Sequence, residues 1–431
     1  MLNATQLINQ IPENDKKDLE FISSKIKESG YESYLIGGSV RDLILGKKPH
    51  EYDLTTSSHP EHVKKLFKRV IETGIQHGTV TVMLADNAYE ITTFRKDIDY
   101  TDGRRPDKIE FGASLSEDMK RRDFTMNAIA LNILSGKMID ENNGIADIQN
   151  KLIRTIGNPL ERFGEDGLRP IRAIRFQSTL NFQIESETYK AIFLTRHITE
   201  KISRERFHDE LNKILNSQNA FIGLYELYKN QIFELFTNEI FTKNLNLELL
   251  KNIDKLEVSP LGLRLVFLLN LLLEDNDKLS KAEVILKDFR YSKSNSKDAL
   301  FYLELFNDNY NIENMSVIEI RKFLSKIVSY TGKREIELIL KGFLSYIRIF
   351  SDKIQFQNFE NTISDILNSN SPLTLKELAV NGNKIIEKFP EMDKRKLGFI
   401  LQGILKQILE DPELNEEEKI FRLIETNKFT L

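Results

Sequence analysis

The stretch Leu35-Ile-Gly-Gly-Ser-Val-Arg-Asp42, with Glu51-Tyr-Asp53 behind it, decides the fold of the first part of the chain. A β-type run enters Gly37-Gly38, and a helix is expected directly after it. Such a turn points bare backbone N–H groups and a helix N-terminus toward an anion such as a phosphate. Arg41, one turn into that helix, could reach the same phosphates. Because turns use Gly-Gly constantly, the acidic residues that follow decide how the pair is interpreted.

Three acidic side chains follow the glycine pair and predict a metal site. Glu51 and Asp53 are two residues apart on a β-type segment, so both carboxylates are expected on one face. Glu90 lies in the alternating run Tyr89-Glu-Ile-Thr-Thr-Phe94, where a half-buried acid is costly unless a cation pairs with it. Hard oxygen ligands next to phosphates suit Mg²⁺. Glu51 and Asp53 alone could be two solvated acids in a turn, but a third acid with a glycine phosphate loop is typical of two-metal phosphoryl or nucleotidyl transfer.

Composition limits the class of protein. The chain has 431 residues, 61 Lys+Arg against 65 Asp+Glu and no Cys, and 40% of it is hydrophobic. These values are typical of a globular protein of two to four domains. The lack of Cys excludes disulfides and thiolate zinc sites and fits a reducing cytoplasm. We expect no signal peptide and no membrane span, since the most apolar stretch, 261–273, is short and interrupted by polar residues. The net charge of −4 means that any RNA binding must come from local patches.

The pattern changes along the chain. β-type runs such as Gly78-Thr-Val-Thr-Val-Met-Leu84 alternate with helical segments up to about residue 145, which predicts an α+β domain. From about residue 146 the apolar spacing is helical almost throughout. Arginine is concentrated in the first part, with 15 of 22 before residue 216. Surface ion pairs would explain this clustering, but arginine also suits bidentate recognition of phosphates and base edges.

Six ordered motifs in residues 31 to 215 resemble those of the class II tRNA nucleotidyltransferases (CCA-adding enzymes) and the related bacterial poly(A) polymerases. The motifs are Gly37-Gly-Ser-Val-Arg-Asp42 with Glu51-x-Asp53, Thr73-Gly-Ile-Gln-His-Gly-Thr-Val-Thr-Val82, Arg104-Arg-Pro-Asp107, Arg121-Arg-Asp-Phe-Thr-Met-Asn-Ala128, Ile139-Asp with Gly144, and Glu165-Asp-Gly-Leu-Arg-Pro-Ile-Arg-Ala-Ile-Arg-Phe176. The resemblance extends weakly through Arg204-Glu-Arg-Phe-His-Asp-Glu-Leu211. The resemblance implies a small nucleotidyltransferase head with a mixed β-sheet (1–145), followed by an all-helical neck with a nucleotide-selecting motif (146–215), a helical body (216–340) and a helical, tRNA-binding tail (341–431).

The resemblance also implies roles for individual residues. The catalytic residues that bind Mg²⁺ would be Glu51, Asp53 and Glu90, although the family usually has Asp in place of Glu51. The nucleotide-binding residues, which hold the triphosphate, contact the nucleotide or form the nucleotide-selecting helix, would be Gly38, Arg41, Arg122, Asp166, Arg169, Arg172 and Arg175. The family tends to place Pro directly after the Glu-Asp pair, whereas here Gly167 follows it and Pro170 comes after Arg169.

The residue types of the last motif agree with base selection. Asp166 and Arg169 are i, i+3 neighbours, and Arg172 and Arg175 continue the same stripe. Asp can accept a hydrogen bond from the exocyclic amine of C or A while Arg donates to the ring acceptor beside it. G and U lack that donor-then-acceptor edge, so the pair would reject both. An ion-paired surface helix remains the alternative interpretation for Arg175.

The resulting functional prediction is template-independent addition of CCA to the tRNA 3′ end, with CTP and ATP as substrates and Mg²⁺ as the cofactor, in the cytoplasm. CC-adding relatives lack the flexible loop that this sequence has between Arg95 and Asp107, which argues against CC-only addition. A-only addition beside a separate CC-adding enzyme, and poly(A) synthesis, remain alternatives. A non-catalytic RNA-binding relative is a further alternative, motivated only by Glu51.

Overall fold

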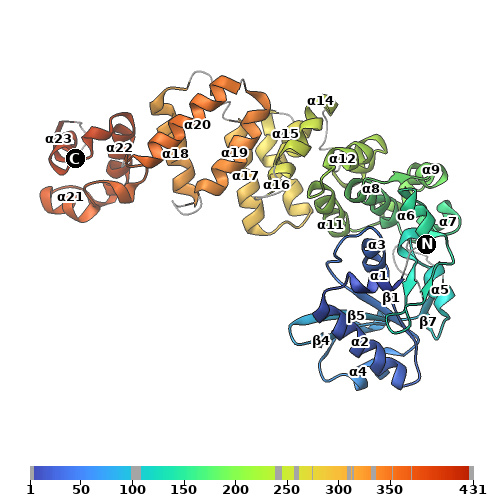
Figure 1. Cartoon of the computed structure of the whole chain (residues 1–431). Helices are drawn as coiled ribbons and strands as arrows, with labels where there is room; N and C mark the ends of the chain where they lie inside the picture. The colour runs from blue at the N-terminus through green and yellow to red at the C-terminus, as the bar shows by residue number, and fades with distance from the viewer. Residues whose placement is uncertain are drawn as a thin grey trace. The chain divides into compact units, whose positions relative to one another are not determined.

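The computed structural model describes residues 4–98, 108–237, 245–256, 262–273, 275–307, 312, 315–331, 336–351, 353–369 and 371–426. Residues 99–107, with the motif Arg104-Arg-Pro-Asp107 and most of the expected loop, lie outside this part. Internal contacts divide the chain into two units, Met1–Leu247 with Ile285–Arg290, and Glu248–Val284 with Tyr291–Leu431. All the described strands belong to the first unit (Figure 1).

A seven-stranded sheet in the order β3-β4-β5-β2-β1-β8-β9 forms the centre of the first unit. The central pair β2–β5 is parallel and the other neighbours are antiparallel, so the predicted mixed sheet is confirmed. Leu35, Leu54 and Ile91 on the three central strands are buried, as expected of apolar residues facing a covered sheet. The strands are β1 (Ser33–Ile36), β2 (Asp53–Thr56), β3 (Val70–Gly74), β4 (Thr79–Leu84), β5 (Asn87–Thr93), β8 (Ala130–Leu131) and β9 (Met138–Ile139).

Helices and one hairpin surround this sheet (Figure 1). Figure 1 shows α2 and α4 together beside the strands, and α2 contacts both β1 and α4. Strands β6 (Arg95–Ile98) and β7 (Lys108–Phe111) pair antiparallel as the two sides of the hairpin. The helices up to residue 149 are α1 (Ala4–Asn9), α2 (Glu13–Glu28), α3 (Gly38–Ile44), α4 (Pro60–Leu66), α5 (Leu115–Lys120) and α6 (Gly144–Gln149).

Among the described residues after 145, the regular elements are helical except for one pair of strands, which corrects the prediction of an all-helical neck. Strands β10 (Leu152–Ile153) and β11 (Gln183–Ile184) form a short parallel pair. Two-residue strands are too short to show an alternating pattern, so the sequence periodicity does not reveal them. The helices of the first unit in this region are α7 (Pro159–Glu165), α8 (Leu168–Leu180), α9 (Ser186–Leu194), α10 (Arg196–Thr199), α11 (Arg204–Leu215), α12 (Ala220–Lys229) and α13 (Ile232–Thr237).

The second unit is helical in its described part. One of its cores packs Ile385, Ile404 and Ile420 from three successive helices. The helices from residue 247 onward are α14 (Leu247–Leu250), α15 (Leu263–Leu272), α16 (Lys278–Asp288), α17 (Lys293–Asn307), α18 (Val317–Thr331), α19 (Ile336–Phe350), α20 (Lys353–Asn368), α21 (Gly382–Lys388), α22 (Leu397–Glu410) and α23 (Glu417–Thr426). Two of the predicted domain boundaries fall inside helices: residue 145 lies in α6 and residue 340 lies in α19. The division into head, neck, body and tail stays a prediction. Among the described residues, we find no helix with the length and apolar character that crossing a bilayer requires.

Candidate active site

The Gly37-Gly38 turn joins the sheet to the first helix of the site. Strand β1 ends at Ile36 and α3 begins at Gly38, with Gly37 between them at φ 78° and ψ −138°. Only glycine adopts this conformation without strain. A Cβ added at Gly37 would lie 3.7 Å from Nη1 of Arg122 and 3.9 Å from Oδ2 of Asp53. The turn therefore lies directly beside one predicted metal ligand and one predicted nucleotide-binding arginine.

Two of the three predicted acids lie on neighbouring strands. Asp53 is the first residue of β2, and its register partner on the parallel strand β5 is Glu90. Glu51 precedes β2 and is exposed, so the predicted strand face shared by Glu51 and Asp53 is wrong: the segment bends before the strand begins. Glu90 is exposed rather than half-buried, and Asp53 is the shielded member of the group.

The electrostatics of the three acids fit a divalent cation. Burial, together with the negative charges of Glu51 and Glu90, raises the pKa of Asp53 from 3.8 to about 6, and the charge of Arg122 opposes this rise. Within the described part of the chain, no group of three or more His, Asp or Glu side chains is already closed around a metal position. Carboxylates that repel one another in this way are the ligand type that hard divalent cations neutralise. The donor set therefore fits Mg²⁺ chemically.

The raised pKa of Asp53 predicts a stability gain on neutralisation. Between pH 3.8 and about pH 6 the folded protein holds a proton at Asp53 more tightly than the unfolded chain, so wild-type stability falls as pH rises through this window. Asp53→Asn should raise the free energy of unfolding by roughly 1–3 kcal/mol at pH 8 in EDTA, and the gain should vanish below about pH 4. Urea unfolding at pH 8, 6 and 4 measures this. An equal gain at pH 8 and pH 4 would contradict the assignment, and Mg²⁺ should stabilise only the wild type.

A pocket of about 490 Å³ brings six of the ten predicted residues together. They come from α3, from the start of β2 and the segment before it, and from a partly buried face of α8: Gly38, Arg41, Glu51, Asp53, Arg172 and Arg175. Glu90 and Arg122 are not among its lining residues, but their charges act on Asp53. The pocket thus combines carboxylates with guanidinium groups, as a site for a metal-bound polyphosphate requires.

The arginines of the pocket surround one aromatic ring. The guanidinium carbons of Arg41, Arg172 and Arg175 lie 5.1, 5.5 and 3.7 Å from the ring centroid of Phe176, within the range of cation–π contact. Burial lowers the pKa of Arg175 to about 10, although the partner carboxylate of Glu210 opposes this shift. The group still carries its charge at neutral pH.

Further ion pairs fix the same arginines. Nη1 of Arg41 donates to Oδ1 of Asn127 at 2.9 Å, and Nε donates to Asp42 at 2.9 Å. Nε of Arg172 donates to Oδ2 of Asp123 at 2.8 Å. Burial alone would raise the pKa of Asp123, but Arg172 and Asn127 hold it well below its usual value. The basic side of the pocket is therefore held by paired, charged groups.

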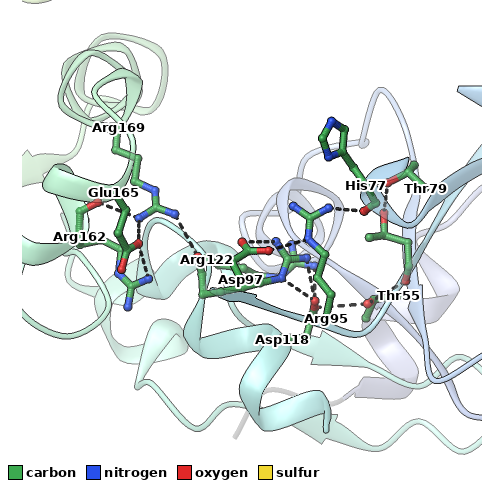
Figure 2. A network of polar contacts seen from close by, with 12 residues as sticks. Thr55, His77, Thr79, Arg95, Asp97, Asp118, Arg122, Arg162, Glu165 and Arg169 are labelled. Carbon is green, nitrogen blue, oxygen red and sulfur yellow. Dashed lines mark hydrogen bonds and ion pairs between the residues drawn. The ribbon is translucent and has the colours of Figure 1, made fainter. Parts of the chain in front are cut away.

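The two residues predicted to read the base lie outside the pocket lining and have other partners. Asp166, between α7 and α8, accepts from Nη1 and Nη2 of Arg206 on α11 at 3.1 and 2.8 Å. Nη1 of Arg169 pairs with Glu165 and donates to the carbonyl of Arg162 at 2.7 Å (Figure 2). The backbone N–H of Arg169 donates to the carbonyl of Asp166 at 3.0 Å, but their side chains are not paired with each other. Asp166 has extended backbone angles before α8 begins, so the prediction that it shares a helical stripe with Arg169, Arg172 and Arg175 is wrong. Pro170 falls in the first turn of α8. Backbone N–H groups of a first turn have no acceptor within the helix, so a proline there costs no helical hydrogen bond.

Sequence reasoning missed several pocket residues. Asp123 and Asn127 lie inside the motif that contributed only Arg122 to the prediction, and Phe176 ends the motif of α8. Lys213 on α11 also lines the pocket and bonds Glu210 at 3.0 Å. The i, i+4 spacing of Asp123 and Asn127 was the available signal. The sequence contains no signal for Lys213, because its pattern does not differ from that of any other lysine on a helix surface.

Comparison with known proteins identifies the family. A family model described as the Poly A polymerase head domain matches residues 33–154, and one described as the probable RNA and SrmB-binding site of polymerase A matches residues 181–242. A CCA-adding enzyme of Streptococcus suis is 33% identical over 97% of this chain and 98% of its own length. The chain belongs to the CCA-adding enzyme family. A CCA-adding enzyme of Ligilactobacillus salivarius is 46% identical over 53% of the chain, a match that spans 56% of that relative.

Solved structures agree with this family assignment. The CCA-adding enzyme of Bacillus stearothermophilus in complex with CTP matches with a TM-score of 0.75 and 28% identity, over 97% of this chain and 98% of that one. A Thermotoga maritima CCA-adding enzyme complexed with tRNA has the same fold, with a TM-score of 0.69 and 18% identity over 98% of both chains. The predicted resemblance to the CCA-adding enzymes and the predicted fold class are confirmed.

Proposed function

We propose that this chain adds C, C and A in turn to the 3′ end of tRNA, with CTP and ATP as substrates and no nucleic-acid template. The observation that carries the proposal is the pocket in which the Gly37-Gly38 turn, Asp53 and the Arg172–Arg175 face of α8 meet. Membership of the CCA-adding enzyme family over nearly the whole chain supports the same reaction. The complex of the Bacillus stearothermophilus relative with CTP supports CTP as a substrate.

The three acids act on the reacting phosphate. In the proposed reaction the 3′-hydroxyl of the tRNA attacks the α-phosphate of the nucleotide, and pyrophosphate leaves. Glu51, Asp53 and Glu90 would hold Mg²⁺, which when bound activates a hydroxyl and neutralises the charge of a leaving pyrophosphate. Asp53 is the shielded acid of the three and lies beside the glycine turn, so we assign it the central position.

Backbone and arginine groups bind the triphosphate. Gly38 begins α3 directly after the turn, and Arg41 lies in the same helix with its guanidinium fixed by Asp42 and Asn127. Arg122 follows α5 in the chain, and its guanidinium lies next to Gly37 and Asp53. We propose that these groups orient the triphosphate so that its α-phosphate faces the three acids.

Base choice is proposed to reside at the start of α8. Asp166 offers an acceptor to the exocyclic amine of C or A, and Arg169 offers a donor to the neighbouring ring acceptor. Their present partners, Arg206 and Glu165, hold both side chains in place. Arg172 and Arg175 extend the same face of α8 to the pocket itself.

The macromolecular partner of the proposed reaction is tRNA. The helices after residue 215 carry dispersed lysines, which we propose contact the RNA backbone as a helical body and tail. The cysteine-free composition supports a cytoplasmic location. The match to the Poly A polymerase head domain keeps poly(A) synthesis as a second candidate activity.

Incorporation of labelled nucleotides separates these activities. The protein is incubated with Mg²⁺ and each of the four nucleoside triphosphates, on tRNA ending before CCA, on tRNA ending in C and on tRNA ending in CC. CCA addition predicts C on the first two substrates, a single A on the third, and no U or G. Incorporation of A on tRNA ending in CC, with no incorporation of C on the other two substrates, identifies an A-adding enzyme. Runs of A identify a poly(A) polymerase. No incorporation on any substrate would overturn the proposal.

Glu51 is expected to work as a metal ligand despite its extra methylene. Glu51→Gln removes a negative charge that acts on Asp53, and we expect incorporation to fall at least tenfold. Glu51→Asp restores the residue usual in the family and should keep or raise activity. Initial rates of C incorporation at saturating CTP measure both variants. Wild-type rates in Glu51→Gln would show that only two acids work here.

A further inference from the structure

A buried carboxylate outside the pocket connects three parts of the site. Asp118 lies on α5 and is fully buried. Its Oδ1 accepts from Nε and Nη2 of Arg121 at 2.9 and 2.7 Å, and its Oδ2 accepts from Nη2 of Arg122 at 3.1 Å. The hydroxyl of Thr55, two residues beyond Asp53 on β2, lies 3.3 Å from the same Oδ2. Figure 2 shows this network, which the sequence analysis did not predict.

The carboxylate of Asp118 is charged, and both of its oxygens accept hydrogen bonds. Burial alone would raise its pKa, but the guanidinium groups of Arg122 and Arg121 hold the pKa below its usual value. A fully buried charge with two cationic partners orients those partners strongly, because each would give up a bonded carboxylate if it moved; Arg121 also lies 3.7 Å from Asp97. The carboxylate therefore fixes the direction of both arginine side chains.

The direction of Arg122 matters for the nucleotide site. While Nη2 bonds Asp118, Nη1 lies beside the Gly37 turn, 3.7 Å from the position of an added Cβ. The positive charge of Arg122 also lowers the pKa of Asp53. Arg122 thus bridges from Asp118 to the place where the glycine turn and the central acid meet.

The second arginine extends the network toward α8. Nε and Nη2 of Arg121 bond Asp118, and the carbonyl of Arg121 accepts from Nη2 of Arg169 at 3.2 Å (Figure 2). One carboxylate therefore positions the arginine beside the metal site, and the backbone of its second partner, Arg121, contacts the arginine proposed to read the base.

We propose that Asp118 is a positioning residue of the nucleotide site, which holds Arg122 in the orientation that contacts the triphosphate; this inference rests on the proposed function. Asp118 itself touches no reacting atom. Without its charge, Arg122 is expected to swing away from the glycine turn, so the loss should appear in the binding of phosphates rather than of the base.

The test compares the binding of CTP and CMP to the full-length protein by titration calorimetry with Mg²⁺. The ratio of the dissociation constant of CMP to that of CTP measures the contribution of the outer phosphates, because CTP carries them and CMP does not. Asp118→Asn should reduce this ratio about tenfold, the value of one charge-assisted hydrogen bond, and Arg122→Ala should reduce it similarly. The double variant should show no further loss, because both changes remove the same contact. An unchanged ratio in Asp118→Asn, or additive losses in the double variant, would overturn the inference.

A matched control separates positioning from general damage. Asp147 is also a buried acid of the first unit, bonded by the hydroxyl of Thr125 at 2.6 Å and by Nε of Arg154 at 3.3 Å, but it does not line the pocket. Asp147→Asn should lower the melting temperature and leave the ratio of the CMP to the CTP dissociation constant unchanged. An equal fall of the ratio in both variants would mean that Asp118 has only a structural role.

Two further outcomes keep the test decisive. If Asp118→Asn does not fold, Arg122→Lys keeps the positive charge but lacks the two guanidinium nitrogens that bond Asp118 and lie beside the glycine turn, and the ratio should fall about tenfold; an unchanged ratio overturns the inference. If the wild type does not bind CTP at all, the proposed function and this inference both fail. Normal CTP binding with an unaffected ratio refutes the inference alone, since binding is measured without tRNA.

Discussion

Asp53→Ala is expected to reduce nucleotide transfer at least about 10³-fold and to change tRNA affinity less than about twofold. The reduction follows because Asp53 is the shielded acid beside the glycine turn, and a metal ion stabilises charge in the transition state by several kcal/mol. Affinity for tRNA should persist because binding comes from phosphate contacts spread over a long surface. Single-turnover incorporation of C and filter binding of tRNA measure the two effects.

The neighbouring Asp42 provides a control for this variant. Asp42 also lines the pocket, but it bonds Arg41 rather than facing the other acids. Asp42→Ala should weaken nucleotide binding and leave the single-turnover rate at saturating CTP within about tenfold of wild type, since one arginine loses its partner. Near-normal incorporation by Asp53→Ala would remove Asp53 from the metal site.

The second large effect is expected in base discrimination. A site built to hydrogen-bond a base edge rejects the wrong base by about 10⁴-fold, because mismatched donors and acceptors stay buried and unpaired. Asp166→Ala removes the acceptor for the amine that C and A share, so rejection of U should weaken by at least about 10²-fold. Arg206 bonds Asp166 through both oxygens, but a carboxylate oxygen can accept a second hydrogen bond. Arg169→Ala should reduce C and A incorporation together.

The measurement compares kcat/KM for CTP and UTP on tRNA ending before CCA. The same comparison is made for ATP and UTP on tRNA ending in CC. Glu161, an exposed acid on α7 that lines no part of the pocket, serves as a control, and Glu161→Ala should leave discrimination unchanged. Unchanged rejection of U in Asp166→Ala would place base selection elsewhere.

The fold was predictable where local patterns are strong. The strands around Leu35 and Ile91, and the glycine turn, follow from β-type runs and from the conformational freedom of Gly37. The short pair β10–β11 was not predictable, because its partners lie about 30 residues apart and contain two residues each. The exposure of Glu90 was also missed, since alternation gives the face of a residue but not what covers it.

The candidate site was predictable as residue types, but its internal contacts were not. The spacing of Glu51 and Asp53 indicated paired acids, and the register of Asp53 with Glu90 supports that grouping. The pairing of Asp166 with Arg206 and the burial of Asp118 could not be predicted, because they depend on side chains brought together from distant segments. Long-range ion pairs leave no periodic trace in a single sequence.

In our proposal, nucleotide transfer takes place in the pocket formed by the glycine turn, Glu51, Asp53 and α8, with Glu90 on the strand beside Asp53. A crystal structure of the protein with CTP and Mg²⁺ tests it most directly. We expect this crystal structure to show the triphosphate between Gly38 and Arg122, density for Mg²⁺ at Asp53 and Glu90, and the cytosine edge at Asp166 and Arg169. CTP bound elsewhere, or bound here with no metal at Asp53, would contradict the assignment of this pocket as the site of nucleotide transfer.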